Sequence, residues 1–168
     1  IEGLPMASHA DPTDAPGVAN AVAKHKATIM FGTSSMLRLF NHSPKVQPAM
    51  LASLRVVVAG AEKLDDSVRE GFAHKFNKAI YEGYGATETA PVAAVNLPDA
   101  VGVHYQQVQK SNKPGTVGMP LPGTSIKVVD PKSFEELPTL EPGMIVISGP
   151  QVMQGYLDDP QRTEQALK

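Results

Sequence analysis

Residues 55–72, RVVVAGAEKLDDSVREGF, contain a strand, a loop and the start of a helix. Residues 55–59 are almost wholly apolar and β-branched, which is typical of a strand that is buried on both faces. Residues 60–62 follow as its exit loop, and Asp65 can cap the next helix. The apolar residues of that helix lie on one face: Val68, Phe72 and Phe76. This stretch predicts one strand–helix unit of an α/β protein.

The same pattern occurs before and after this stretch. Residues 28–31 are apolar and β-branched and predict a buried strand, after which Gly32 turns the chain into a second helix. Asp14, with Pro16 tolerated in the first turn, predicts an earlier helix. A third short strand is expected at residues 79–82.

Strands without polar alternation, separated by helices, predict a parallel sheet that is layered with helices and covered on both sides. Ligands of such sheets gather at the carboxyl ends of the strands. Two loops have that position, residues 60–62 and residues 83–88. We therefore expect an α/β region over residues 1–108 that carries a binding site in these loops.

The pattern changes after residue 108. Pro and Gly alternate with short β runs, of which residues 125–129 and 144–148 are the clearest. This pattern predicts an antiparallel sheet or small barrel over residues 109–168. A helix is expected only after Pro160, over residues 163–168.

The composition excludes several classes of protein. A formal net charge of -2 without a long Lys/Arg run gives no electrostatic footprint for nucleic acid or an anionic membrane. The absence of cysteine excludes disulfides and thiolate metal sites, and no apolar run is long enough to span a bilayer. We expect a cytoplasmic protein that binds small molecules and does not insert into a membrane.

The loop after the third strand has the residues of a phosphate site. Gly83 and Gly85 let backbone amides approach an anion, and Thr87 adds a hydroxyl. Glu88 among phosphates serves as a magnesium ligand, and Tyr84 can present its ring to a base. The alternative is a glycine turn with a solvated Thr–Glu pair.

Other motifs have simpler interpretations. The dinucleotide fingerprint fails because Glu88 stands where its third glycine is needed, and neither a P-loop nor a Gly-x-Ser-x-Gly elbow occurs. The hydroxyl cluster at residues 33–35 is first a helix N-cap and only secondarily a candidate nucleophile. The five histidines occur singly. Lys63 and Arg69 are interpreted as solvated charges unless the edge of the sheet holds an anion.

Four motifs in order resemble the adenylate-forming (AMP-binding) enzymes: acyl-CoA synthetases, luciferases and peptide-synthetase adenylation domains. Residues 84–88, YGATE, have that family's Tyr-Gly-x-Thr-Glu form, and residues 60–62 resemble its adenine loop, in which a small residue is commoner than Glu at the third position. Residues 115–123, GTVGMPLPG, and 148–157, SGPQVMQGYL, resemble the turn and the barrel segment that follow. The resemblance covers residues 28–163 and implies part of the large N-terminal domain of such an enzyme.

The resemblance implies ATP and Mg²⁺ as cofactors and a role for each loop residue. Tyr84 would stack on adenine, Thr87 would contact phosphate and Glu88 would bind Mg²⁺, the last two counting as catalytic. Gly83 and Gly85 would leave space where the carboxylate of the substrate meets the α-phosphate. The other side of adenine would be lined by Gly60, Ala61 and Glu62. An acyl channel would be walled by Thr33, Met36 and Leu37, although a core role is the alternative for each.

Within the family, residues 82–99, 60–64 and 26–38 look most like bacterial acyl-acyl-carrier-protein synthetases joined to 2-acylglycerophosphoethanolamine acyltransferase. This implies a fatty acid as substrate, acyl carrier protein or coenzyme A as acceptor, and a parent chain on the cytoplasmic face of the inner membrane. The alternatives are a long-chain acyl-CoA synthetase, a peptide-synthetase adenylation domain, or a non-catalytic nucleotide-binding module.

Three parts of the family pattern do not occur in these 168 residues. They are the phosphate loop ending in Pro-Lys-Gly, the Thr-Gly-Asp whose aspartate binds ribose, and the C-terminal domain with its catalytic lysine. We therefore expect a fragment from the middle of a larger enzyme that is inactive by itself.

Overall fold

The computed structural model describes residues 3–101 and 108–167. The chain divides into two compact units, Ile1–Tyr84 with Val95–Gly118 and Gly85–Ala94 with Met119–Lys168. Residues 85–94 thus belong with the C-terminal part of the chain. The predicted boundary at residue 108, between the α/β region and the β-rich region, stays a prediction.

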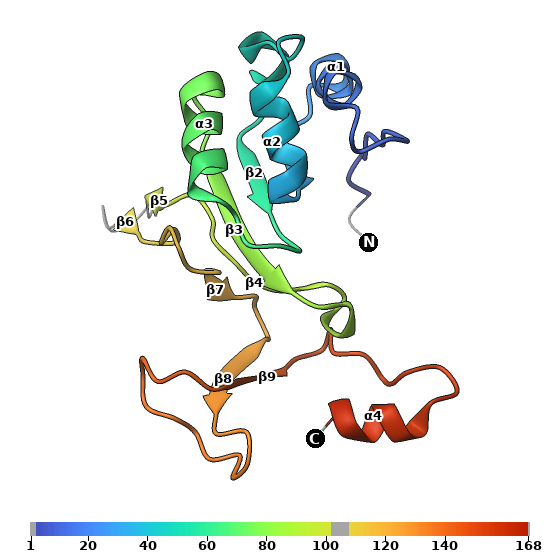
Figure 1. The fold of residues 1–168 in the computed structure, drawn as a ribbon, viewed down its shortest axis with the longest axis vertical. Helices are drawn as coiled ribbons and strands as arrows, with labels where there is room; N and C mark the ends of the chain where they lie inside the picture. Colours follow the sequence, from blue (N-terminus) through green and yellow to red (C-terminus); the bar gives the residue numbers. More distant parts are fainter. Residues whose placement is uncertain (1–2, 102–107, 168) are drawn as a thin grey trace. The chain divides into compact units, whose positions relative to one another are not determined.

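The first unit is built on three parallel strands (Figure 1). Strand β1 (Ile29–Gly32) pairs with β2 (Val56–Ala59), and β2 pairs with β3 (Ile80–Gly85), whose last residue begins the second unit. The register places Phe31 beside Val58 and Val58 beside Tyr81. The prediction of parallel strands near residues 28–31, 55–59 and 79–82 is confirmed.

Three α-helices and a 3₁₀ turn accompany these strands: α1 (Ala15–His25), α2 (Ser34–His42), η1 (Pro48–Leu51) and α3 (Asp66–Phe76). The predicted cap of α1 is present, since the Asp14 carboxylate accepts a hydrogen bond from the Gly17 amide. Asp65 precedes α3, as predicted, but its carboxylate pairs with Arg38. The first unit also contains the short antiparallel pair β5 (Ala100–Val101) and β6 (Val108–Gln109).

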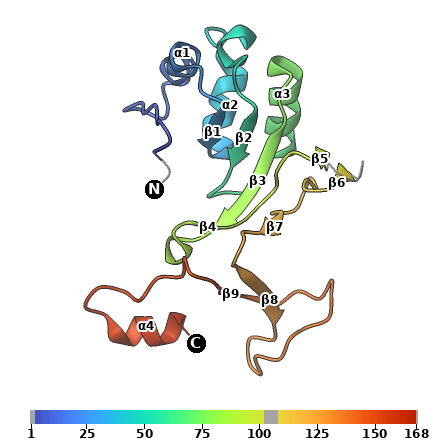
Figure 2. The same ribbon diagram turned by 180° about the vertical axis from the view of Figure 1, so that it is seen from behind.

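Helices α2 and α3 pack side by side against one face of the strands (Figures 1 and 2). Leu37 and Phe40 from α2 and Phe72 from α3 are fully buried there, and the Phe40 and Phe72 ring centroids lie 6.5 Å apart. The ammonium of Lys75 on α3 donates hydrogen bonds to the carbonyls of Phe40, Asn41 and Ser43 at 2.7, 3.1 and 2.7 Å. The core of this unit therefore lies between the helices and one sheet face.

The other face of β1 is open among the described residues. Ile29 and Phe31 are 48% and 69% exposed, whereas Met30 between them is buried. The expected cover on both sides is present at β2, where Val57 and Val58 point to opposite faces and are both buried, and is missing on one face of β1 within the described residues. A pure apolar run shows that a strand can be buried on both faces but does not show which chain segment covers each face.

The second unit contains short elements: η2 (Thr87–Thr89), β4 (Val92–Val95, whose last residue belongs to the first unit), β7 (Met119–Pro120), β8 (Ser125–Val129), β9 (Met144–Ser148) and α4 (Pro160–Ala166). Strands β8 and β9 are antiparallel, with Ile126 opposite Ile147 and Val128 opposite Ile145. Their predicted bounds, 125–129 and 144–148, are confirmed. Helix α4 begins at Pro160 rather than residue 163, because the Asp159 side chain caps it by accepting from the Arg162 amide.

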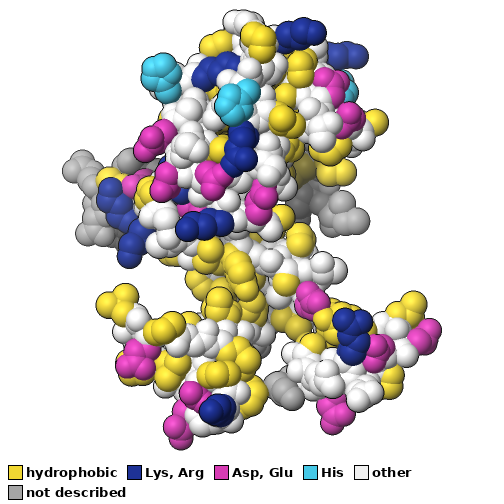
Figure 3. Space-filling view, in the orientation of Figure 1, with side chains coloured by type: hydrophobic (Ala, Val, Ile, Leu, Met, Phe, Trp, Pro, Cys, Tyr) yellow, Lys and Arg dark blue, Asp and Glu magenta, His cyan; other side chains and the backbone are white. Residues whose placement is uncertain are grey.

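Charges of both signs are interspersed on the face of the first unit drawn in Figure 3. This mixture agrees with the small net charge of -2. Among the helices of the described residues, none is long and apolar enough to cross a membrane.

Candidate functional site: two loops that each hold a carboxylate

The exit loop of β2 lies beside the end of β3 in the first unit. The Gly60 amide donates to the Gly32 carbonyl at 3.1 Å, and Ala61 has a positive φ of 68°. A Cβ placed on Gly60 would lie 3.6 Å from the Gly83 carbonyl oxygen, an ordinary contact distance. The parallel pairing thus brings together the loop at residues 60–62 and Gly83, two segments that the sequence assigns to one nucleotide site.

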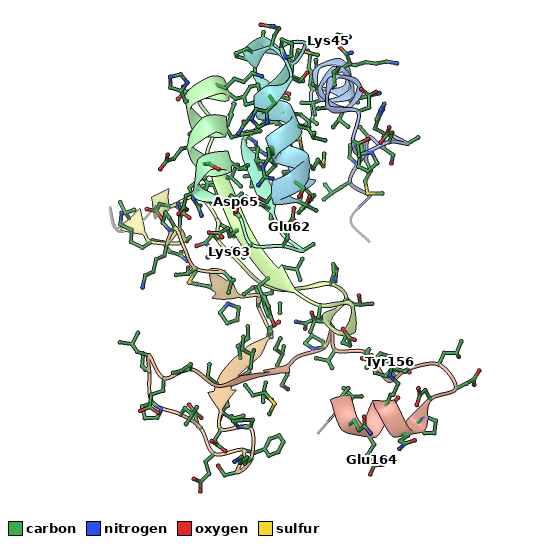
Figure 4. All side chains as sticks on the ribbon, in the orientation of Figure 1. Lys45, Glu62, Lys63, Asp65, Tyr156 and Glu164 are labelled. Atoms are coloured by element: carbon green, nitrogen blue, oxygen red, sulfur yellow. The ribbon has the colours of Figure 1, made fainter. Side chains whose placement is uncertain are left out.

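Glu62 turns away from this contact and toward helix α2 (Figure 4). Its carboxylate accepts from the Ser35 amide at 2.5 Å and from the Ser35 hydroxyl at 3.2 Å. The Ser35 amide, then the Ser35 and Thr33 hydroxyls, hold the pKa of Glu62 below its ordinary value. A carboxylate at a helix N-terminus is stabilised by the unpaired amides there. Its predicted contact with adenine stays a prediction, while the observed contact is with the first turn of α2.

The three residues assigned to an acyl channel lie at the start of α2. The Thr33 hydroxyl caps the helix by accepting from the Met36 amide at 3.2 Å. Leu37 is fully buried in the core, and Met36 packs partly buried against it. These are the contacts of a helix cap and of core residues. The assignment of all three to an acyl pocket stays a prediction.

Strand β3 is anchored by a polar network just before Tyr84. The Glu82 carboxylate accepts from the Arg69 guanidinium at 2.7 Å and from the Gly115 amide at 3.2 Å. The side chains of Arg69 and Glu82 are only 20% and 14% exposed. The interpretation of Arg69 as a solvated charge is therefore wrong, because the ion pair draws it to the strand. Tyr84 itself is half-buried.

Asn96 extends this network, and sequence reasoning missed it. Its side chain is 1% exposed and donates to the Thr116 carbonyl at 2.6 Å, while its oxygen accepts from the Lys113 amide at 2.8 Å. The main-chain amide of Asn96 donates to the Glu82 carbonyl at 2.8 Å. A lone Asn in VNLPD carries no signal of this role, since Lys113 and Thr116 lie 17 and 20 residues away.

In the second unit, Gly85 opens a tight turn. A Cβ on Gly85 would lie 1.6 Å from the Pro91 carbonyl oxygen, so no larger residue fits without movement of the backbone. The buried Thr89 hydroxyl accepts from the Ala86 amide at 3.0 Å and closes the turn. Thr87 is exposed on its surface. The glycine is thus required by the turn itself, and Thr89, which was not predicted, shapes it.

Glu88 is held by the segment around Tyr156. The Tyr156 hydroxyl donates to Glu88 Oε1 at 2.5 Å, and the Met153 amide donates to the Glu88 carbonyl at 2.8 Å. The Tyr156 hydroxyl is the largest cause that lowers the pKa of Glu88, and the same bond raises the pKa of Tyr156. The sequence places Tyr156 in a family motif but does not predict this contact, because the two residues lie 68 positions apart.

The donor set around Glu88 fits a magnesium ion shared with a nucleotide. Mg²⁺ is usually bound by one or two carboxylates together with substrate phosphates and water. Within residues 3–101 and 108–167, no cluster of three or more His, Cys, Asp or Glu side chains could hold a metal. A single ionised carboxylate beside an exposed Thr hydroxyl can therefore complete such a shell but cannot form a cage alone.

Comparison with known families gives one match over most of the chain. The family described as AMP-binding enzyme matches residues 4–157. This range contains both loops described above. The resemblance stated from the four sequence motifs is thereby confirmed at the level of the family.

Curated relatives include two kinds of CoA ligase. A long-chain-fatty-acid–CoA ligase of Escherichia coli O6:H1 is 30% identical over 158 residues, which are 94% of this chain and 26% of that protein. 4-Coumarate–CoA ligase 1 of Solanum tuberosum is 33% identical over 148 residues, 88% of this chain and 26% of that protein. The chain thus spans 26% of the length of these relatives.

Solved structures give the same fold. Apo MatB from Rhodopseudomonas palustris matches with a TM-score of 0.75 and 28% identity, over 91% of this chain and 28% of MatB. ATP-bound MatB from the same organism matches with a TM-score of 0.70 and 28% identity, over 92% of this chain and 28% of that chain. The α/β fold with a β-rich continuation is confirmed as that of a part of these enzymes.

Proposed function

Because the chain belongs to the AMP-binding enzyme family, we propose that it carries the adenine and magnesium loops of an enzyme that activates a carboxylic acid with ATP. The observation that carries the proposal is the Tyr84–Glu88 motif, in which Glu88 presents an ionised carboxylate held by Tyr156. A binding module without catalysis has little use for such a ligand. The printed names of the relatives, which are CoA ligases, support the same class of reaction.

The proposed reaction has two steps. A carboxylate oxygen of the substrate attacks the α-phosphorus of ATP, the bond from that phosphorus to the bridging β-phosphate oxygen breaks, and pyrophosphate leaves. A thiol then attacks the acyl carbon of the adenylate, loses its proton, and displaces AMP. Such chemistry depends on positioning and on neutralising charge more than on covalent work by the protein.

Each loop residue has a proposed part in the first step. Tyr84 stacks on adenine, and Gly60 with Ala61 borders its other side. Thr87 donates its exposed hydroxyl to a phosphate oxygen. A magnesium ion bound at Glu88 would supply positive charge to the phosphates. The remaining assignments, at Glu62, Gly83, Gly85 and the residues of the acyl channel, are proposed in the form given from the sequence.

We propose a fatty acid as substrate and coenzyme A as the acceptor thiol, in line with the E. coli O6:H1 relative. The second candidate acceptor is acyl carrier protein, which the resemblance of residues 82–99 favours. A linked 2-acylglycerophosphoethanolamine acyltransferase and association with the inner membrane belong to this second candidate. A peptide-synthetase adenylation domain would take an amino acid in place of a fatty acid.

The test is exchange of labelled pyrophosphate into ATP by the longest natural chain that contains these residues. Fatty acids and amino acids are compared as substrates, with Glu88→Ala as the inactive variant. Glu164→Ala, at an exposed position of α4 (Figure 4), is the matched control. We expect exchange that depends on a fatty acid, is lost in Glu88→Ala and is kept in Glu164→Ala.

The alternatives give different results in the same assay. Exchange that requires an amino acid would identify a peptide-synthetase domain. Nucleotide binding without exchange for any carboxylate would favour the binding module. When exchange is observed, competition between coenzyme A and acyl carrier protein for the acyl group identifies the acceptor.

A further inference from the structure

We propose that Tyr156 is a positioning residue that fixes the Glu88 carboxylate for a metal–nucleotide complex. The inference rests on the proposed function and goes beyond it, because it assigns a second residue to the metal site. The Tyr156 hydroxyl and the Glu88 carboxylate belong to the same compact unit and are joined by a hydrogen bond of 2.5 Å.

Glu88 needs such a partner because no other side chain of its own turn donates a hydrogen bond to its carboxylate. It lies in a 3₁₀ turn of three residues, Thr87–Thr89, and its side chain is half-buried. A glutamate side chain has three rotatable bonds, whose freedom is costly to lose when a ligand binds. A partner that fixes the carboxylate beforehand removes part of this cost. Tyr156 does so through Oε1, and the carboxylate keeps further lone pairs for a cation.

Tyr156 is itself held in place by the first turn of α4. Its amide donates to the Thr163 hydroxyl at 2.8 Å, and this hydroxyl donates to the Asp159 carbonyl at 2.9 Å. The Arg162 guanidinium carbon lies 5.4 Å from the centroid of the Tyr156 ring, within the range of a cation–π contact. Figure 4 shows Tyr156 beside α4. Tyr156 is thus held by helix α4 through its amide and its ring, while its hydroxyl is hydrogen bonded to Glu88.

The segment before Tyr156 is connected to the same turn. The Met153 amide binds the Glu88 carbonyl at 2.8 Å, so main chain and side chain of Glu88 are both held by residues 153–156. Gly155 has a positive φ of 153°, and a Cβ there would lie 2.9 Å from the Thr163 methyl carbon. The close passage of this segment past Thr163 sets the direction of the phenol.

The test measures ATP affinity by calorimetry with Mg²⁺ and again with EDTA, in the longest natural chain that contains these residues. In Tyr156→Phe only the hydroxyl is lost. Partners behind metal ligands typically contribute 10- to 100-fold to metal affinity. We expect Tyr156→Phe to weaken binding of Mg·ATP about tenfold while metal-free ATP binds as before. A merely structural role would weaken both equally.

A double-mutant cycle with Glu88→Ala identifies the residue through which Tyr156 acts. If Tyr156 works through Glu88, Tyr156→Phe has no further effect in the Glu88→Ala background. An equal effect in both backgrounds, or none in the wild-type chain, overturns the inference. Thr163→Val should weaken Mg·ATP binding in the same way but to a smaller degree, and Thr163→Ser, which keeps the hydroxyl, should bind Mg·ATP like the wild type. Leu157→Ala, at a 91% exposed position, should leave the affinities for Mg·ATP and for metal-free ATP unchanged.

The two levels of proposal fail in different ways. If Mg²⁺ does not improve ATP affinity in the wild-type chain, or Glu88→Ala leaves the improvement intact, the metal role of Glu88 is wrong, and the role of Tyr156 is wrong with it. If the improvement depends on Glu88 but survives Tyr156→Phe, only the present inference is wrong. Thermal melts of each variant separate loss of binding from loss of folding.

Discussion

Glu62 and Glu88 follow neighbouring strands of the chain, and both carboxylates are hydrogen bonded to hydroxyl groups, but their partners differ in kind. Glu62 accepts from an amide and a hydroxyl of Ser35, so it completes the first turn of α2. Glu88 accepts from the phenol of Tyr156 through one oxygen and stays half-buried at the surface. A carboxylate at a helix N-terminus serves the fold, whereas one held at a single oxygen can still bind a cation.

The largest expected difference is in activity. Glu88→Gln keeps the shape of the side chain but removes the charge, and we expect it to lower kcat/KM about 100-fold, as loss of one electrostatic contact in a transition state does. Glu62→Gln keeps a side chain of the same size at its proposed place beside adenine, and activity should stay within a few-fold of wild type. Pyrophosphate exchange by the two variants measures the contrast, and equal losses would contradict the distinction between the two carboxylates.

The second prediction compares the glycines of the two loops. Gly85→Ala places a Cβ 1.6 Å from the Pro91 carbonyl oxygen, and we expect overpacking to lower the free energy of unfolding by about 2 kcal/mol. Gly60→Ala meets only the Gly83 carbonyl at 3.6 Å and should cost less. Urea unfolding checks this order, which would be wrong if Gly60→Ala were the more destabilising change.

The third prediction concerns the far end of α2. Lys75 donates hydrogen bonds to three carbonyls at the C-terminus of α2. Lys75→Met should therefore lower the free energy of unfolding by about 1 kcal/mol and leave activity unchanged. Burial lowers the pKa of Lys75, which shows that its ammonium is partly removed from water. Lys45→Met, at an exposed position, is the control. Equal stability of Lys75→Met and Lys45→Met would show that the carbonyls at the end of α2 form hydrogen bonds with water when the ammonium is removed.

The smallest expected effect is the contribution of Glu62 to stability and its dependence on pH. Hydrogen bonds from Ser35 and Thr33 lower its folded pKa below the ordinary 4.5, so the folded state favours the ionised form. This stabilisation is present above about pH 4.5 and is lost as pH falls through the lower folded pKa. The Tm difference between wild type and Glu62→Gln should therefore shrink below pH 4.5; a constant difference would exclude the linkage.

Local signals in the sequence predicted most elements. The β-branched run at residues 55–59 predicted β2, and the bounds of β8 and β9 were found correctly from Pro and Gly on either side. The Asp14 cap was found because its partner, Gly17, is three residues away. Helix α4 begins three residues before its predicted start, because Asp159 caps it directly before Pro160.

Contacts that are distant in the chain were not predictable in this way. The pattern around Arg69 does not indicate its ion pair with Glu82, which lies 13 residues away on a strand, and the motifs that contain Asn96 and Tyr156 do not indicate the partners of these side chains. The open face of β1 was also missed, since a strand of apolar residues has the same pattern whether one face or both are covered in the described chain.

The sequence by itself determined the strand and helix order, the parallel pairing and the position of the two loops, because turn residues and hydrophobic periodicity act over a few residues. Through its motifs it also determined the family. Only the tertiary structure decided the partner of each carboxylate, Ser35 for Glu62 and Tyr156 for Glu88. The first pair is 27 positions apart in the sequence and the second pair is 68 positions apart. Hydrogen bonds over such separations depend on how the chain folds back, which no local pattern encodes.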